Sequence, residues 1–149
     1  MFETLKLIHV LAAIIWVGGS IMAQLFALRL TAAAPAHRLG FARDLRFAAS
    51  RIFVPSAIVL LGAGIWMVAD SPGFAFGDPF VVIGLVAVGG SLATAIGYLI
   101  PNIGRAIELM TSGRGPEAGA VIRKVALAAR AVIVILLVAV WAMVVKPGG

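Results

Sequence analysis

One histidine lies within the first apolar run of the chain, in the stretch IHVLAAIIWVGGS. A helix turns by about 100° per residue, which places the less apolar side chains of this region on one narrow stripe. The stripe consists of His9, Ala13, Trp16, Ser20 and Gln24. His9 follows Glu3 by six residues, so it lies about 9 Å below the membrane boundary. A polar side chain at that depth needs a partner, and the stripe is therefore expected to face other helices.

A neutral imidazole is a good ligand for haem iron, copper or zinc. The second histidine, His37, belongs to the connection after the first run, so one chain does not bring both histidines to one metal. Methionine serves as an axial haem ligand or a Cu(I) ligand, and Met67 and Met143 are candidate second ligands at a similar depth. In the other interpretation, His9 only bonds to a neighbouring helix and packs there. Both interpretations remain open at this point.

Arg130 is the other costly side chain inside an apolar run, since a central arginine costs roughly 2.5 to 3.5 kcal/mol to insert. It follows Lys124 by six residues, so it lies about 9 Å from the inner surface and can extend to the headgroups. Alternatively, it pairs with a haem propionate, a phospholipid phosphate or a quinone oxygen. Patterns for a zinc cluster, a Ser/His/Asp set and a phosphate loop are missing, and the chain has no cysteine.

These side chains belong to a very apolar chain. Its 149 residues are 62% hydrophobic and 12% charged, with a mean hydropathy of +1.13. A soluble protein of this size has no interior that could hold so many apolar residues. Four runs reach the roughly 20 helical residues that a bilayer crossing needs, namely residues 5–28, 52–69, 80–100 and 125–145. We therefore predict an all-α, integral membrane four-helix bundle, with residues 1–149 as a single transmembrane domain in the lipid bilayer.

The basic residues are distributed unevenly over the connections. Those after the first and third runs hold Arg29, Arg38, Arg43, Arg46, Arg51, Arg105, Arg114, Arg123 and Lys124. Only Lys6 and Lys146 lie on the other side, together with an acidic central loop. The positive-inside rule then predicts a bacterial-type inner membrane protein with both termini outside. Since the basic residues flank the apolar runs, the net charge of +6 does not indicate nucleic-acid binding, and we expect none.

Several local signals refine the expected helices. Asp78-Pro79 is typical of an N-cap followed by proline in the first turn, so it should begin the third helix. Residues 37–50 have apolar positions at helical spacing and are predicted to extend the second helix into the cytoplasm. After Pro101, we expect either a kinked extension of the third helix or a short interfacial helix, ending at Gly113.

A weak internal repeat is present. The motif VGGS occurs at residues 17–20 and again at residues 88–91, in two helices that should run in the same direction. This indicates two pseudo-repeated helical hairpins. Gly89, Ala93 and Gly97 form a ridge of small residues, which is typical of a close-packing face between membrane helices. Trp66 and Trp141, near the outer ends of the second and fourth helices, are expected in an interfacial belt.

Three short motifs resemble those of one known group of membrane proteins. His9, Trp16 and Gly19 have the spacing of a first-helix motif in that group. The stretch RIFVP, residues 51–55, followed by Gly64, is similar to its second-helix motif, and MVVKPGG is similar to its C-terminal tail. On these residues the chain resembles the HemJ-type protoporphyrinogen oxidases and the related CopD-like proteins. It departs from the HemJ pattern at Gln24-Leu25, which replace Pro-Arg, and in residues 80–100, which lack the family's lysine.

The resemblance implies the four-helix scaffold and b-type haem bound through His9, for electron transfer or a membrane oxidation, rather than the porphyrinogen oxidase reaction. In this reading Trp16 and Gly19 shape the haem pocket, and Met67, Met143 or the His9 of a second copy is the sixth ligand. Arg130 reaches a propionate only if the haem lies lower in the bundle. Two alternatives remain: a cofactor-free structural or accessory subunit with membrane partners, and a copper-handling protein that uses His9 with the methionines.

Overall fold

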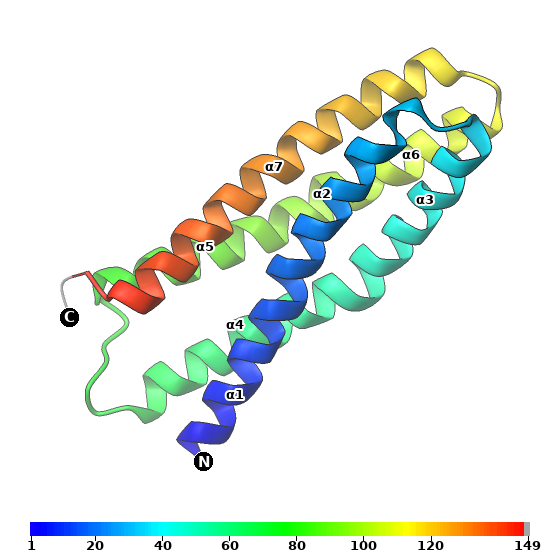
Figure 1. The fold of residues 1–149 in the computed structure, drawn as a ribbon. Coiled ribbons are helices and arrows are strands. Elements are labelled where there is room, and N and C mark those ends of the chain that lie inside the picture. The colour runs from blue at the N-terminus through cyan, green and yellow to red at the C-terminus, as the bar shows by residue number, and fades with distance from the viewer. Residues whose placement is uncertain (148–149) are drawn as a thin grey trace.

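The computed structural model describes residues 1–147, so Gly148 and Gly149, the end of the predicted 1–149 domain, lie outside the described residues. Long antiparallel helices make up the molecule, and residues 1–147 contain no β-strand (Figure 1). The helical segments are α1 Phe2–Ala13, α2 Gly19–Arg29, α3 Pro35–Ala48, α4 Val54–Asp70, α5 Pro79–Thr94, α6 Ile100–Thr111 and α7 Gly115–Val145. Short π-helical turns join α1 to α2, α3 to α4 and α5 to α6.

Four continuous helices are therefore long and apolar enough to cross a membrane. They are Phe2–Ala32, Pro35–Asp70, Pro79–Thr111 and Gly115–Val145, with 31, 36, 33 and 31 residues. Each exceeds the roughly 20 residues that a crossing requires. The predicted fold class is confirmed: the chain is an all-α four-helix bundle of a polytopic membrane protein, in contact with the lipid bilayer.

The helices continue beyond the apolar runs that predicted them. The second helix begins at Pro35, so residues 37–50 are its helical extension, as expected. The third helix continues past Pro101 to Thr111, and the chain then turns at Gly113. The φ of Gly113 is 76°, in the left-handed region that glycine adopts without strain. Hydropathy marks the part of a helix that meets hydrocarbon, whereas hydrogen bonding and turn residues decide where the helix ends.

Proline explains two of the three π-helical turns. The turns are Ile14–Gly18, Ala49–Phe53 and Ala95–Leu99. The second ends two residues before Pro55, and the third ends two residues before Pro101. Proline has no N–H to donate, and its ring collides with the carbonyl four residues earlier, so a wider turn relieves the collision. The first turn has no proline and contains Trp16 instead.

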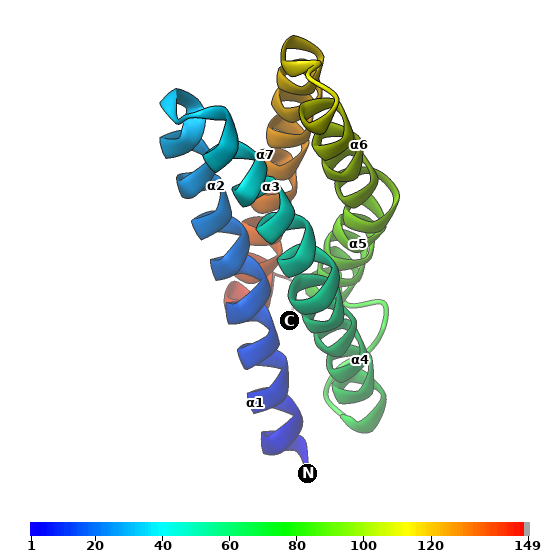
Figure 2. The same ribbon diagram turned by 90° about the vertical axis from the view of Figure 1, so that its right-hand side faces the viewer.

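The four helices form a ring in which each contacts its neighbours. α1 packs on α4, α2 packs on α7, both α5 and α6 pack on α7, and α3 packs on α6. In Figure 2, α1 and α2 lie on the left, α5 and α6 on the upper right and α4 on the lower right, with α3 between the two sides. The central core draws on all four helices through Ala12, Trp16, Ala57, Leu60, Val88, Val132 and Leu136.

A second apolar cluster closes the end of the bundle that holds the α4–α5 loop. Phe80 and Val81 of α5 pack against Ala142 of α7. Directly after α7, the Nζ atom of Lys146 lies 4.6 Å from the centre of the Phe74 ring, which is a cation–π contact. The loop is therefore tied to the C-terminal end of α7.

The third helix begins where the Asp78-Pro79 pair predicted. Pro79 is its first residue, and Asp78 is the N-cap residue. The Asp78 side chain makes no capping bond, because its Oδ2 accepts a hydrogen bond from the N–H of Ala75 at 2.8 Å. The carboxylate thus orders the loop, while proline, whose φ already suits a helix, starts the helix.

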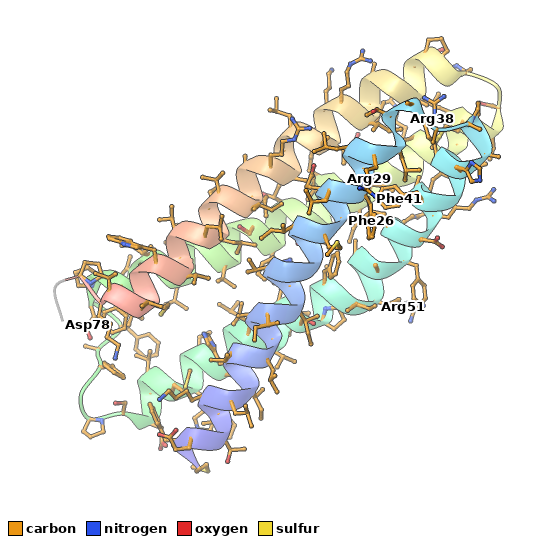
Figure 3. All side chains as sticks on the ribbon, viewed as in Figure 1. Phe26, Arg29, Arg38, Phe41, Arg51 and Asp78 are labelled. Atoms are coloured by element: carbon orange, nitrogen blue, oxygen red, sulfur yellow. The ribbon has the colours of Figure 1, made fainter. Side chains whose placement is uncertain are left out.

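Charge is divided between the two ends of the bundle. Both termini and the α4–α5 loop lie at one end (Figure 1). Asp78 is at this end, whereas Arg29 and Arg38 are at the opposite end (Figure 3). The orientation in the membrane stays a prediction, and the positive-inside rule places the arginine end in the cytoplasm.

Single cysteines test this orientation. We expect a membrane-impermeant thiol reagent to label Gly73→Cys in the α4–α5 loop of intact cells and to leave Gly40→Cys in α3 unlabelled. The chain has no cysteine of its own. A Cβ at Gly73 would have Ser71 Oγ as its nearest non-adjacent neighbour at 3.9 Å, and one at Gly40 meets no neighbouring side chain or helix of residues 1–147 within 4 Å, so both sites tolerate the change. Permeabilised cells, in which both label, are the control, and the reverse pattern contradicts the orientation.

Candidate functional site

His9 of α1 joins the first helix to the second. Its Nδ1 lies 2.9 Å from the carbonyl oxygen of Leu60 in α4. A Cβ built on Gly64, one turn after Leu60, would lie 3.1 Å from His9 Cε1. Glycine at this position therefore lets the half-buried imidazole lie close against α4.

The Leu60 carbonyl fixes the tautomer of His9. A carbonyl oxygen only accepts hydrogen bonds, so Nδ1 carries the proton and donates it. In the neutral ring, Nε2 then keeps its lone pair. Histidines that bind metals or haem iron are commonly held in this way, with one nitrogen donating to a carbonyl and the other free to coordinate. The same bond also satisfies a histidine that only packs, so it fits both interpretations of His9.

The two candidate methionine ligands lie in different places. Met67 is on α4, seven residues after Leu60, and so on the same face of that helix. Met143 is on α7, where its methyl group occupies the space that a side chain at Gly84 of α5 would need. Met143 also packs against the second apolar cluster. The structure thus places Met67, and not Met143, on the helix face that contacts His9, and a ligand role for either stays a prediction.

Trp16 and Gly19, the predicted pocket residues, both make packing contacts. Trp16 is 3% exposed and belongs to the central core. A Cβ on Gly19 would collide with the ring of Phe53 from the second helix. Phe53 itself packs against the central core. Both residues therefore bring helices together, and their role in a haem pocket stays a prediction.

Gly18 and Gly19 offer a matched pair of substitutions. We expect Gly19→Ala to lower the free energy of unfolding by about 1–3 kcal/mol, because the new methyl group overlaps the Phe53 ring in a packed region. Gly18→Ala should be neutral or slightly stabilising, because its Cβ meets no neighbouring side chain or helix of residues 1–147 within 4 Å and alanine favours helix. Far-UV circular dichroism during SDS unfolding in mixed micelles measures both.

The contact itself is tested by a second change. Phe53→Leu shortens the side chain that meets Gly19, so it should recover most of the stability that Gly19→Ala loses. Equal effects of Gly18→Ala and Gly19→Ala would contradict this contact.

The polar stripe of the first helix faces neighbouring helices, as its spacing indicated. At one end His9 bonds to α4, and at the other Gln24 Nε2 donates to the carbonyl of Ala126 in α7 at 3.5 Å. Gln24 Oε1 is buried and has no hydrogen-bond partner among residues 1–147. The stripe therefore connects the first helix to two different neighbours.

Arg130 lies at a different site from His9. It is exposed on α7 and lines a groove of about 500 Å³ together with Tyr98 and Lys124. Neither Leu60 nor Gly64, which lie against His9, lines this groove. Among the predicted site residues, the structure thus places Met67 on the face of α4 that His9 contacts. Trp16 lies in the core cluster that also contains Leu60, while Gly19, Met143 and Arg130 make contacts elsewhere.

Leu60 and Gly64 are the partners of His9 that the spacing of polar side chains did not reveal. Leu60 contributes only its backbone carbonyl, which every residue possesses, so its side chain carries no signal. Gly64 appeared in the sequence only as part of the second-helix motif, and a glycine alone does not reveal a contact. A Cβ on Gly62 of the same helix meets no neighbouring side chain or helix of residues 1–147 within 4 Å.

Among residues 1–147, no group of three or more histidine, aspartate or glutamate side chains is arranged to hold a metal ion. A metal at His9 thus needs further ligands of another kind, such as a thioether or a porphyrin. Comparisons of the chain with protein-family models, with curated proteins and with solved structures gave no match.

Proposed function

We propose that this small polytopic membrane protein binds b-type haem through His9 Nε2, for electron transfer or an oxidation within the membrane. The observation that carries the proposal is the hydrogen bond from His9 Nδ1 to the carbonyl of Leu60. This bond holds the imidazole in one tautomer and against one helix, with Nε2 free to coordinate. The resemblance to the HemJ-type and CopD-like proteins belongs to the same proposal.

A single histidine ligand suits haem better than a metal ion that is held by side chains alone. Zinc held by side chains usually takes three or four protein ligands, and residues 1–147 gather no such group from His, Asp and Glu. A porphyrin brings its own four nitrogens, so one imidazole suffices on the protein side. When bound, b-type haem supplies a one-electron couple whose potential depends on its axial ligands and its burial. Met67 or the His9 of a second copy is the candidate for the sixth position.

A cofactor-free accessory subunit is the second candidate, and the ridge of Gly89, Ala93 and Gly97 favours it. This ridge was predicted to be a close-packing face. A Cβ built on Gly89 or Gly97 meets no neighbouring side chain or helix of residues 1–147 within 4 Å, and Ala93 is exposed. The ridge is thus open for the close approach of a helix from another subunit or from a second copy.

Absorption spectra distinguish the candidates. We expect protein purified in mild detergent, alone or after incubation with haem, to give a b-type difference spectrum on dithionite reduction, with one iron per chain or per dimer. A colourless, metal-free preparation that haem does not reconstitute contradicts the proposal and favours the accessory subunit. Bound copper without porphyrin absorbance contradicts it as well and favours copper handling by His9 with the methionines.

A further inference from the structure

We propose that the groove around Tyr98, Lys124 and Arg130 binds an anionic phospholipid at the basic end of the bundle. The groove measures about 500 Å³ and lies between the π-helical turn Ala95–Leu99 and α7. Its lining residues are Tyr98, Lys124, Leu127, Ala128, Arg130, Ala131 and Val134. Leu60 and Gly64, the residues that lie against His9, are not among them, so this site stands independently of the proposed haem function.

The groove is lined by positive charge, which favours an anionic ligand. Lys124 and Arg130 are both exposed, and no acidic side chain lines the groove. The ion pairs found among residues 1–147 are Lys6–Glu3 and Arg114–Glu117, and neither includes a groove residue. A cation at membrane depth is stabilised by a counter-charge, and the phosphate of a lipid headgroup is the anion available there. The hydroxyl of Tyr98 adds a further hydrogen-bond donor.

The apolar part of the groove favours a whole lipid over a free anion. Lys124 and Arg130 are six residues apart on α7, about 9 Å along its axis, so a phosphate between them is within reach of both long side chains. Leu127, Ala131 and Val134 occupy the rest of the α7 wall and continue away from the basic end. A headgroup held by the two cations then leaves an acyl chain lying on this apolar wall.

Lipid titration by native mass spectrometry of the detergent-purified protein tests the site. We expect phosphatidylglycerol to bind about 25-fold more tightly than phosphatidylcholine, since each of the two cations contributes about five-fold. Lys124→Gln and Arg130→Gln should each lower the affinity for phosphatidylglycerol about five-fold, and the double variant about 25-fold. Ala131→Phe keeps both charges but fills the groove, so it should weaken binding too. If the double variant does not fold, the single variants carry the test.

Arg123→Gln is the matched control. Arg123 is the neighbour of Lys124 on α7 and lies at a similar depth, yet it does not line the groove. Its loss should change the affinity by no more than about twofold. Inorganic phosphate should not compete, because it has no acyl chain to place on the apolar wall. The proposal would be overturned if the two lipids bound equally well or if inorganic phosphate competed with the lipid. It would also be overturned if Ala131→Phe left the lipid affinity unchanged, or if Arg123→Gln and Lys124→Gln lowered it equally.

Discussion

We expect His9→Ala to abolish the reduced b-type haem absorbance that the wild-type protein gains when it is incubated with haem. The substitution removes Nε2, the axial nitrogen that the Leu60 carbonyl holds in place through Nδ1. The matched control is His37→Ala, which removes the other histidine of the chain. His37 is exposed on α3, so its loss should leave the spectrum unchanged. Full retention of haem in His9→Ala would exclude His9 as the ligand.

The His9→Ala protein should remain folded, so its spectrum reports on the ligand. Hydrogen bonds between membrane helices contribute about 0.6 kcal/mol on average and rarely more than about 1.7 kcal/mol. Loss of the bond to Leu60 is therefore a small change in stability. If His9→Ala instead destabilises the haem-free protein by far more than this, packing is the main role of His9. Imidazole added to His9→Gly should restore part of the haem absorbance, because a free imidazole can replace the missing ligand.

The helices could be predicted from the sequence because apolar length is a direct consequence of bilayer thickness. Their ends could not be predicted in the same way. The second apolar run begins at residue 52, yet the helix begins at Pro35, and the helical spacing of apolar positions in residues 37–50, rather than apolar length, predicted this extension. Those residues keep helical hydrogen bonding outside the apolar run, where hydropathy no longer marks the helix. Pro55 and Pro101 remain inside long helices because the preceding π-helical turns accommodate them.

The orientation of the candidate site followed from spacing, whereas its partners did not. The stripe from His9 to Gln24 showed which side of the first helix meets other helices. The partner atoms are carbonyls of Leu60 and Ala126, and which carbonyl lies opposite depends on how the helices cross.

The two VGGS motifs likewise show that identical residues in two helices need not have equivalent neighbours. A Cβ on Gly19 of the first motif would collide with Phe53, whereas one on Gly90 of the second meets no neighbouring side chain or helix of residues 1–147 within 4 Å. The two-hairpin repeat therefore stays a prediction.

Trp16→Ala should give the largest loss of stability of any single substitution in the central core. Replacement of a buried tryptophan by alanine costs roughly 3–5 kcal/mol in water-soluble proteins. In a bilayer, moving an apolar side chain from lipid into the protein contributes little to stability. The loss in free energy of unfolding therefore comes from the lost packing contacts, and we expect about 3 kcal/mol. The loss is large because Trp16 packs in a cluster to which all four helices contribute. SDS unfolding in mixed micelles measures the change.

The other two tryptophans are the controls for Trp16. Trp66 and Trp141 are 55% and 54% exposed, against 3% for Trp16, so their replacement by alanine should change stability by no more than about 0.5 kcal/mol. Trp16→Phe keeps much of the ring and should lose less than Trp16→Ala. Equal losses in all three alanine variants would contradict a central packing role. Trp16→Ala measured with and without haem then separates its two roles, because a pocket residue also weakens haem binding whereas a packing residue lowers stability alone.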